Sequence, residues 1–260
     1  MAVPEIDLKL PRPVTALHQI ETSSECQLSN WCSYCIHSQL GREKKAMTMD
    51  IFERALAHVD HYVNKELSQD ELNLAGVGEP TLQPLLVEMV KKARAVMGNS
   101  WLNLTSNGVA WTEELAQGLA PYLSTHHGHK AGVFISSHIP KKAKTAIDLC
   151  RKYGMLIAIS HDPAENTIDW AGQVDVEHTA ATNRECPWIR QGRVMVSSCG
   201  YALTCCMDIA ENSKLGHVND PVGTWVTKPW SLCSSCDQEV GVKGFSQYGS
   251  GGRRLPKAKA

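Results

Sequence analysis

Residues 26–35 read CQLSNWCSYC and bring Cys26, Cys32 and Cys35 together in one short run. The run follows residues 14–20, whose apolar and β-branched side chains predict a first strand. In a parallel β/α fold, the loop after a strand lies at the carboxyl edge of the sheet, where active sites gather. Three thiolates on such a loop can hold three irons of a [4Fe–4S] cluster and leave the fourth iron open to an external ligand.

Downstream of this run, apolar residues alternate between strand and helix spacing. Strands are expected at residues 14–20, 71–75, 101–105, 132–136 and 155–159, and helices at 49–64, at 85–97, from Thr112, and from Pro140 to near Gly154. The alternation predicts βαβ units and a parallel sheet. A closed eight-unit barrel takes about 250 residues. The available length therefore predicts an α/β fold, a partial and open parallel β/α barrel of five to six units.

The pattern changes after about residue 176, where short strand-like pieces, tryptophans, prolines and cysteines replace the long helices. We therefore expect a barrel domain over residues 1–175 and a small cysteine-rich domain over residues 176–245. Residues 246–260 follow a glycine-rich stretch and are expected to form a flexible basic tail.

The composition restricts the class of protein. The chain has 260 residues with 26 basic and 27 acidic side chains, which gives a net charge of −1 and no long-range attraction to nucleic acid or acidic membranes. No apolar run reaches the roughly 18–20 residues of a membrane helix, and no signal peptide is visible. A cytoplasmic location is expected, and in that compartment ten clustered cysteines indicate metal or redox chemistry. By spacing alone, zinc with His37 as fourth ligand, or a purely structural cluster, remain alternatives at the first group.

Four segments resemble the radical S-adenosylmethionine (radical SAM) enzymes. Residues 17–26 (LHQIETSSEC) resemble the first strand and cluster entry of that family, and Tyr34 matches its aromatic residue before the third cysteine. The family usually spaces these cysteines as x3 and x2, so the x5 spacing here contains two extra residues. The further matches are AGVGEPTL at 75–82 to the Gly-Gly-Glu-Pro segment, TSNG at 105–108 to a Thr-Asn-Gly strand end, and FISS at 134–137 to the fourth strand end.

The resemblance implies two cofactors at this edge: a [4Fe–4S] cluster on Cys26, Cys32 and Cys35, and S-adenosylmethionine on its open iron. It implies that the residues contacting S-adenosylmethionine are Tyr34, Gly76, Gly78, Glu79, Pro80, Ser106, Asn107 and Ser136, with Ser136 preferred over Ser137. Glycines let the backbone approach a ligand closely, although a plain turn is the alternative.

A second group of cysteines reads Cys186-x13-Gly200-x4-Cys205, then Cys206, and later Cys233-x2-Cys236. Spacing alone leaves zinc and iron–sulfur level. The pattern looks like the Twitch domain, a half-size relative of the SPASM domain. That resemblance assigns Cys186, Cys205, Cys233 and Cys236 to a second, auxiliary [4Fe–4S] cluster.

Three cysteines remain outside these sets. Cys199 and Cys206 either pack or donate a hydrogen atom to a substrate radical. Cys150 is expected in the core.

Several histidines also carry candidate roles. His126, His127 and His129 form a tight group that predicts a solvated loop, with a metal site as the alternative. His138 and His161 follow predicted strand ends and are candidates for substrate contacts.

The resemblance implies reductive cleavage of S-adenosylmethionine to a 5′-deoxyadenosyl radical, which takes a hydrogen atom from a small polar metabolite. Oxidation with the auxiliary cluster as electron acceptor, as in aminocyclitol dehydrogenase-type members, is the preferred outcome. Epimerisation through Cys206 or Cys199 and modification of a short peptide are the alternatives. The expected partners are the small-molecule substrate and an external electron donor such as flavodoxin or ferredoxin. The non-enzymatic alternative is a binding module with structural zinc or passive clusters.

Overall fold

The computed structural model describes residues 11–29, 31–32, 35–67, 69–160 and 186–234. Its main sheet has eight strands in the order β6-β5-β4-β3-β2-β7-β8-β9. The strands are β2 (Ala16–Ile20), β3 (Glu71–Leu74), β4 (Trp101–Ser106), β5 (Ala131–Ser136), β6 (Ile157–Ser160), β7 (Arg193–Val196), β8 (Tyr201–Leu203) and β9 (Lys214–His217). From β6 to β7 all neighbours pair in parallel, and β8 and β9 are antiparallel. The predicted parallel sheet and its first five strands are confirmed.

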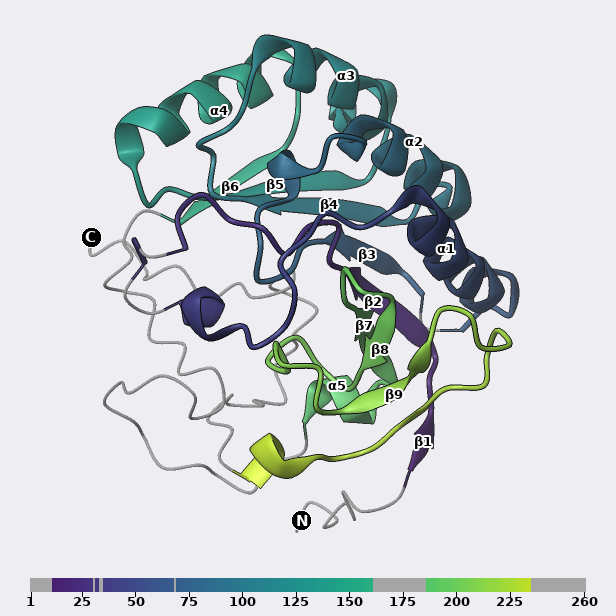
Figure 1. The fold of residues 1–260 in the computed structure, drawn as a ribbon. Helices are drawn as coiled ribbons and strands as arrows, with labels where there is room; N and C mark the ends of the chain where they lie inside the picture. Colours follow the sequence, from purple (N-terminus) through teal and green to yellow (C-terminus); the bar gives the residue numbers. More distant parts are fainter. Residues whose placement is uncertain (1–10, 30, 33–34, 68, 161–185, 235–260) are drawn as a thin grey trace, which may run out of the picture.

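Four helices follow β2, β3, β4 and β5 and lie side by side along one face of the sheet (Figure 1). They are α1 (Met49–Asn64), α2 (Leu86–Met97), α3 (Glu113–Leu123) and α4 (Pro140–Lys152). Thr112 caps α3 by accepting a hydrogen bond from Leu115 N, and Pro140 opens α4, as the sequence predicts. In the described part of the chain, no helix combines the length and apolarity needed to cross a membrane.

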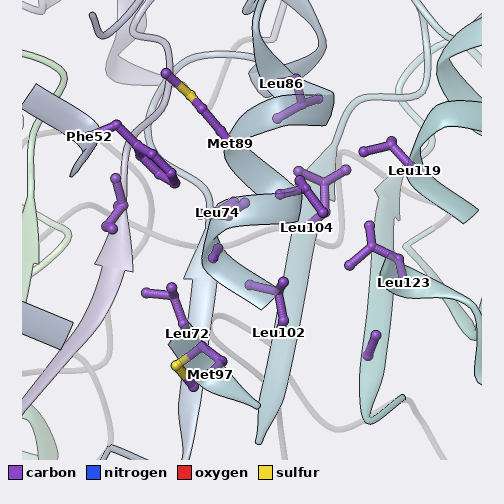
Figure 2. Close-up of a cluster of buried hydrophobic side chains, with 14 of the residues drawn as sticks. Phe52, Leu72, Leu74, Leu86, Met89, Met97, Leu102, Leu104, Leu119 and Leu123 are labelled. Atoms are coloured by element: carbon purple, nitrogen blue, oxygen red, sulfur yellow. The ribbon is translucent and has the colours of Figure 1, made fainter. Parts of the chain in front are cut away.

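The core lies between these helices and the sheet. Leu72 and Leu74 of β3 and Leu102 and Leu104 of β4 are fully buried against this layer, as Figure 2 shows. Burial of one such side chain stabilises the fold by roughly 1.5–3 kcal/mol. Because side chains alternate along a strand, the residues between these leucines point to the other face of the sheet. That face is polar.

The polar face is lined by neighbouring strands. Asn103 Nδ2 of β4 donates to Glu71 Oε1 of β3 at 2.6 Å. His18 of β2 lies 3.2 Å, Nε2 to Nδ2, from Asn73 of β3. Burial, with a smaller contribution from the charge of Arg193, lowers the pKa of His18 to about 3. The sheet therefore presents hydrogen-bonding groups on the side away from α1–α4.

The chain after residue 186 continues the same sheet. Strand β7 pairs in parallel with β2, and β8 and β9 follow it as an antiparallel extension. A short sheet of β1 (Arg12–Pro13) and β10 (Val226–Thr227) also joins the two ends of the described chain. The boundary expected near residues 170–180 and the tail 246–260 lie outside the described residues, so the division at 175 stays a prediction.

The remaining elements are short. They are α5 (Pro187–Arg190) and the 3-10 helices η1 (Ile36–Gln39), η2 (Pro80–Leu82), η3 (Thr125–His127) and η4 (Ser231–Ser234). Trp188 of α5 packs edge-on against His18, with 5.3 Å between ring centroids. The segment after residue 186 thus reaches the polar face of the sheet.

Candidate functional site

The carboxyl edge of the parallel strands brings three of the predicted segments into contact. Glu79 N donates to Glu25 O at 2.7 Å, which joins the loop after β3 to the cysteine run. Asn107 N, after β4, donates to Glu79 Oε2 at 2.6 Å. Asn107 Nδ2 in turn lies 3.9 Å from Cys26 Sγ. The three loops therefore form one connected surface.

Glu79 is the centre of this connection. Its Oε1 accepts hydrogen bonds from Thr81 N at 3.0 Å, Thr81 Oγ1 at 2.7 Å and Ser106 Oγ at 2.8 Å. The carboxylate is almost fully buried, and burial raises its pKa. Because the chain itself supplies these donors, Glu79 fixes the loop after β3 against the end of β4. Direct contact of Glu79 with a cofactor stays a prediction.

Gly76 and Gly78 are explained by close packing within the chain. A Cβ on Gly76 would lie 2.3 Å from Glu21 Cγ, and a Cβ on Gly78 would lie 2.2 Å from Ser23 O. Only glycine allows the loop to approach the end of β2 so closely. Pro80 follows directly as a buried residue in the first turn of η2.

The cysteine loop is tied at its base. Ser24 N donates to Lys45 O at 2.9 Å, and Met47 N donates to Thr22 O at 2.8 Å, so the chain returns beside the strand that it left. A backbone bridge between Ser23 and Ala46 lies between these two bonds. The base of the loop is therefore closed by backbone contacts within the chain.

The thiols of this loop influence one another. Burial raises the pKa of Cys26, and the charges of Glu79 and Cys35 raise it further against a hydrogen bond from Leu28 N. Burial also raises the pKa of Cys35, with a smaller contribution from the charge of Cys32. Thiols that oppose one another's ionisation are stabilised as thiolates by a cationic centre. Tyr34, predicted beside them, lies outside the described residues.

His37 has one ring nitrogen, Nδ1, that is buried without a hydrogen-bond partner among the described residues. The ring is buried, and its Nε2 lies 2.8 Å from Ser24 O. Within the described ranges, no three histidine, cysteine, aspartate or glutamate side chains converge tightly enough to hold a single metal ion. Zinc with His37 as fourth ligand nevertheless stays an alternative at this loop.

The predicted serines differ in their surroundings. Ser106 is buried, and its Oγ also accepts hydrogen bonds from Gly108 N at 3.0 Å and Trp111 Nε1 at 2.9 Å. Ser136 is half-buried at the end of β5, whereas Ser137 is buried. Ser136 is therefore the more accessible of the two.

The later cysteines also gather. Burial raises the pKa of Cys205 well above its usual range, and the charges of Cys206, Cys186 and Cys233 add to it. Cys186, Cys205 and Cys206 pack against the buried side chains of a small apolar cluster, which are Trp188, Met195 and Leu203. The structure thus places Cys206 with the predicted auxiliary ligands. Cys236 lies outside the described residues.

Cys199 lies apart from that group, in the turn after β7. Burial raises its pKa, and the charge of Glu211 raises it further against the charges of Lys45 and Arg42. Because β7 is parallel to β2, this turn is at the same edge as the cysteine loop.

Of the remaining candidates, His138 follows the end of β5 at this edge, and the others lie elsewhere or outside the described residues. His126 and His127 are exposed in η3, and His129 Nε2 lies 2.9 Å from Pro121 O. Cys150 is buried in α4, where burial raises its pKa to about 12. Burial lowers the pKa of His138. His161 lies outside the described residues.

The chain resembles known proteins in its structure rather than in its sequence. No protein-family model matches the chain, and no curated protein matches its sequence. Among solved structures, a crystal structure of BtrN in complex with AdoMet and 2-DOIA matches with a TM-score of 0.62 and 16% identity, covering 80% of each chain. An open conformation of BtrN matches with a TM-score of 0.52 at 16% identity, over 83% of this chain and 78% of that one. The enzyme anSMEcpe with bound AdoMet matches with a TM-score of 0.53 at 16% identity, over 80% and 79%.

These proteins are radical SAM enzymes. The chain has the fold of the radical SAM enzymes. The α/β fold with a parallel sheet is consistent with the expected partial barrel, and the sheet continues through β7 to β9.

Sequence reasoning missed four residues at this edge of the radical SAM fold: Glu21, Arg42, Ser198 and Glu211. Arg42 Nη2 donates to Glu21 Oε2 at 2.6 Å, and Ser198 N donates to the same oxygen at 2.9 Å. Arg42 belongs to a charged stretch that is typical of a solvated loop, so only the pairing of β7 with β2 exposes its role.

Proposed function

We propose that the protein is a radical SAM enzyme in which Cys26, Cys32 and Cys35 hold the catalytic [4Fe–4S] cluster. When bound, that cluster supplies the electron for reductive cleavage of S-adenosylmethionine to a 5′-deoxyadenosyl radical. The observation that carries the proposal is the connected carboxyl edge, where Glu79 and Asn107 join the cysteine loop to the ends of β3 and β4.

The chain's own residues then bind and orient S-adenosylmethionine. Glu79 fixes the loop after β3, and Asn107 Nδ2 is directed at Cys26 Sγ. The cysteine loop and the loop after β3 are therefore held in a fixed arrangement. We assign cofactor contacts to Tyr34, Gly76, Gly78, Glu79, Pro80, Ser106, Asn107 and Ser136. Preorganisation of this kind reduces the cost of ordering the site on binding.

The proposed reaction is abstraction of a hydrogen atom from a small polar metabolite, followed by oxidation. The polar face of the sheet supports this substrate class, because Asn73 Oδ1 and Asn103 Oδ1 are buried there without a hydrogen-bond partner among the described residues. We assign an auxiliary [4Fe–4S] cluster to Cys186, Cys205, Cys233 and Cys236 as the electron acceptor. The gathering of three of these thiols with Cys206 supports that assignment. A flavodoxin or ferredoxin is the proposed electron donor to the first cluster.

Epimerisation is the second candidate reaction. Cys199 lies at the carboxyl edge after β7, apart from the other late cysteines, which favours Cys199 over Cys206 as a hydrogen donor.

The test is iron, sulfide and zinc per chain after anaerobic reconstitution. About eight irons with matching sulfide indicate two four-iron clusters. The C205A variant is expected to hold about four, and C150A, which changes a core cysteine, about eight. Zinc without iron would contradict the proposal and favour a structural binding module.

A further inference from the structure

A buried arginine lies next to the cysteine loop and contacts three other segments. Arg42 Nη2 donates to Glu21 Oε2 at 2.6 Å, Nε donates to Ile209 O at 2.7 Å, and Nη1 donates to Ser198 Oγ at 3.1 Å. Nε also lies 3.5 Å from Glu211 Oε1. The side chains of Arg42 and Glu21 are 8% and 1% exposed, so both charges are removed from water.

Glu21 extends this contact to the loop after β3. Besides Arg42, its Oε2 accepts from Ser198 N at 2.9 Å, and its Oε1 accepts from Val77 N at 3.2 Å. The absence of a side chain at Gly76 makes room for this carboxylate. The Glu21–Arg42 pair therefore joins the cysteine loop, the loop after β3 and the turn after β7.

A small apolar cluster also connects the cysteine loop, the loop after β3 and the segment after Cys205. Ile36 and Leu40 follow Cys35, and they are buried together with Ile209, which follows the Cys205–Cys206 pair. Val77, from the loop after β3, packs against them. Polar and apolar contacts therefore converge on one junction between the two cysteine-bearing regions.

The far side of the junction is strained. Glu211 is a buried non-glycine residue with a φ of +58°, in the left-handed region. Its Oε1 accepts a hydrogen bond from Ser197 Oγ at 2.7 Å while facing Arg42. Such backbone strain persists where surrounding contacts determine the conformation, as they do here.

We propose that Arg42 and Glu21 are positioning residues that hold the cysteine loop and the Gly76–Pro80 loop in register with the segment after Cys205. This inference rests on the proposed function, because the loops concerned are those assigned to the cluster and to S-adenosylmethionine. Removing Arg42 leaves the buried charge of Glu21 without its ion-pair partner, and neutralising Glu21 leaves Arg42, among the described residues, with only the longer ion pair to Glu211. Either change should loosen the joined segments together. Partners beyond the direct ligands of a metal site typically change its binding by about 10–100-fold when they are replaced.

The experiment compares R42M, R42K and E21Q with R94K. Arg94 is also buried, and its guanidinium donates to the backbone oxygens of Tyr122, Gly98, Ser100 and Lys130, away from the carboxyl edge. R94K therefore disturbs a buried arginine without touching the junction. R42K keeps the positive charge but lacks the several N–H donors of the guanidinium, so it tests their geometry. It also serves as the test if R42M does not fold.

Two readouts are used. In reconstituted, reduced protein, the change in the electron paramagnetic resonance spectrum on titration with S-adenosylmethionine reports only the cluster with an open iron. In metal-free protein, alkylation rates of Cys26, Cys32 and Cys35, resolved by mass spectrometry, report how well the loop is held.

We expect R42M, R42K and E21Q to weaken the binding of S-adenosylmethionine by about tenfold or more and to accelerate alkylation. R94K should change neither quantity, and R42M/E21Q should cost little more than either single variant, because the residues act as a pair. Wild-type binding and alkylation in R42K and E21Q, or equal losses in R94K, would overturn the inference. A wild-type protein that holds iron but shows no spectral response to S-adenosylmethionine would overturn the proposed function, and this inference with it.

Discussion

The two groups of cysteines are supported in different ways. The first group lies on a loop closed by backbone hydrogen bonds and joined through Glu79 and Asn107 to the ends of β3 and β4. The second group packs on the small apolar cluster of Trp188, Met195 and Leu203 near β7 and β8. The first site is thus organised by the parallel sheet itself, whereas the second rests on the small apolar cluster, and we expect it to depend more on the iron–sulfur cluster proposed to bind there.

The largest expected effect is that of removing the metal. Structural metal sites contribute on the order of 10 kcal/mol to folding, so the region of Cys186–Cys233 should lose much of its protection when iron is chelated. Strands β2 to β5 should keep theirs, because the core that covers them contains no cysteine except Cys150. Hydrogen exchange with and without iron measures the difference. An equal loss of protection in both regions would contradict the difference proposed between the two groups of cysteines.

Replacement of Glu79 should have the next largest effect. E79A leaves four chain groups without their acceptor, namely Thr81 N, Thr81 Oγ1, Ser106 Oγ and Asn107 N. Each buried unsatisfied donor costs about 1–3 kcal/mol, so the free energy of unfolding should fall by about 3 kcal/mol or more. Denaturant titration of the metal-free protein measures this. E113Q, at an exposed carboxylate of α3, should cost far less, and a comparable loss there would contradict the account.

His18 should make stability depend on pH. Its pKa is lowered to about 3 in the folded chain. As the pH falls below 6.5, the ordinary pKa of histidine, His18 takes up a proton in the unfolded chain, whereas in the folded chain it does so only near pH 3. Stability is therefore lost across this window, by about 2 kcal/mol at pH 5. Denaturant titrations of H18Q should show a smaller decline between pH 7.5 and 5 than wild type. H126Q, at an exposed histidine, should follow wild type.

A smaller effect is expected at Gly76. In G76A the new Cβ would collide with the Glu21 side chain, and overpacking of this kind costs about 1–3 kcal/mol. The variant should lower the midpoint of thermal unfolding of the metal-free protein. An unchanged midpoint would show that the end of β2 can shift, and that the first site is less rigid than its contacts indicate.

Much of this architecture could be predicted from local patterns. Strand and helix periodicity located β2 to β6 and α1 to α4, and Thr112 and Pro140 marked helix starts, because these signals depend on near neighbours in sequence. The cysteine spacing located both groups. The pairing of β7 with β2 could not be predicted, since it joins residues more than 170 positions apart. The roles of Arg42 and Glu21 were missed because their contacts with Ser198 join residues 156 and 177 positions apart. Cys206 and Cys199 could be told apart only once the pairing of β7 with β2 was known.

The central claim is that the carboxyl edge forms a radical SAM active site. The most direct measurement is the release of 5′-deoxyadenosine by reconstituted protein with S-adenosylmethionine and a chemical reductant under anaerobic conditions, quantified by mass spectrometry. The account predicts release by wild type and by C150A, and none by C26A. Iron-loaded wild-type protein that releases none, or C26A that releases as much as wild type, would contradict it.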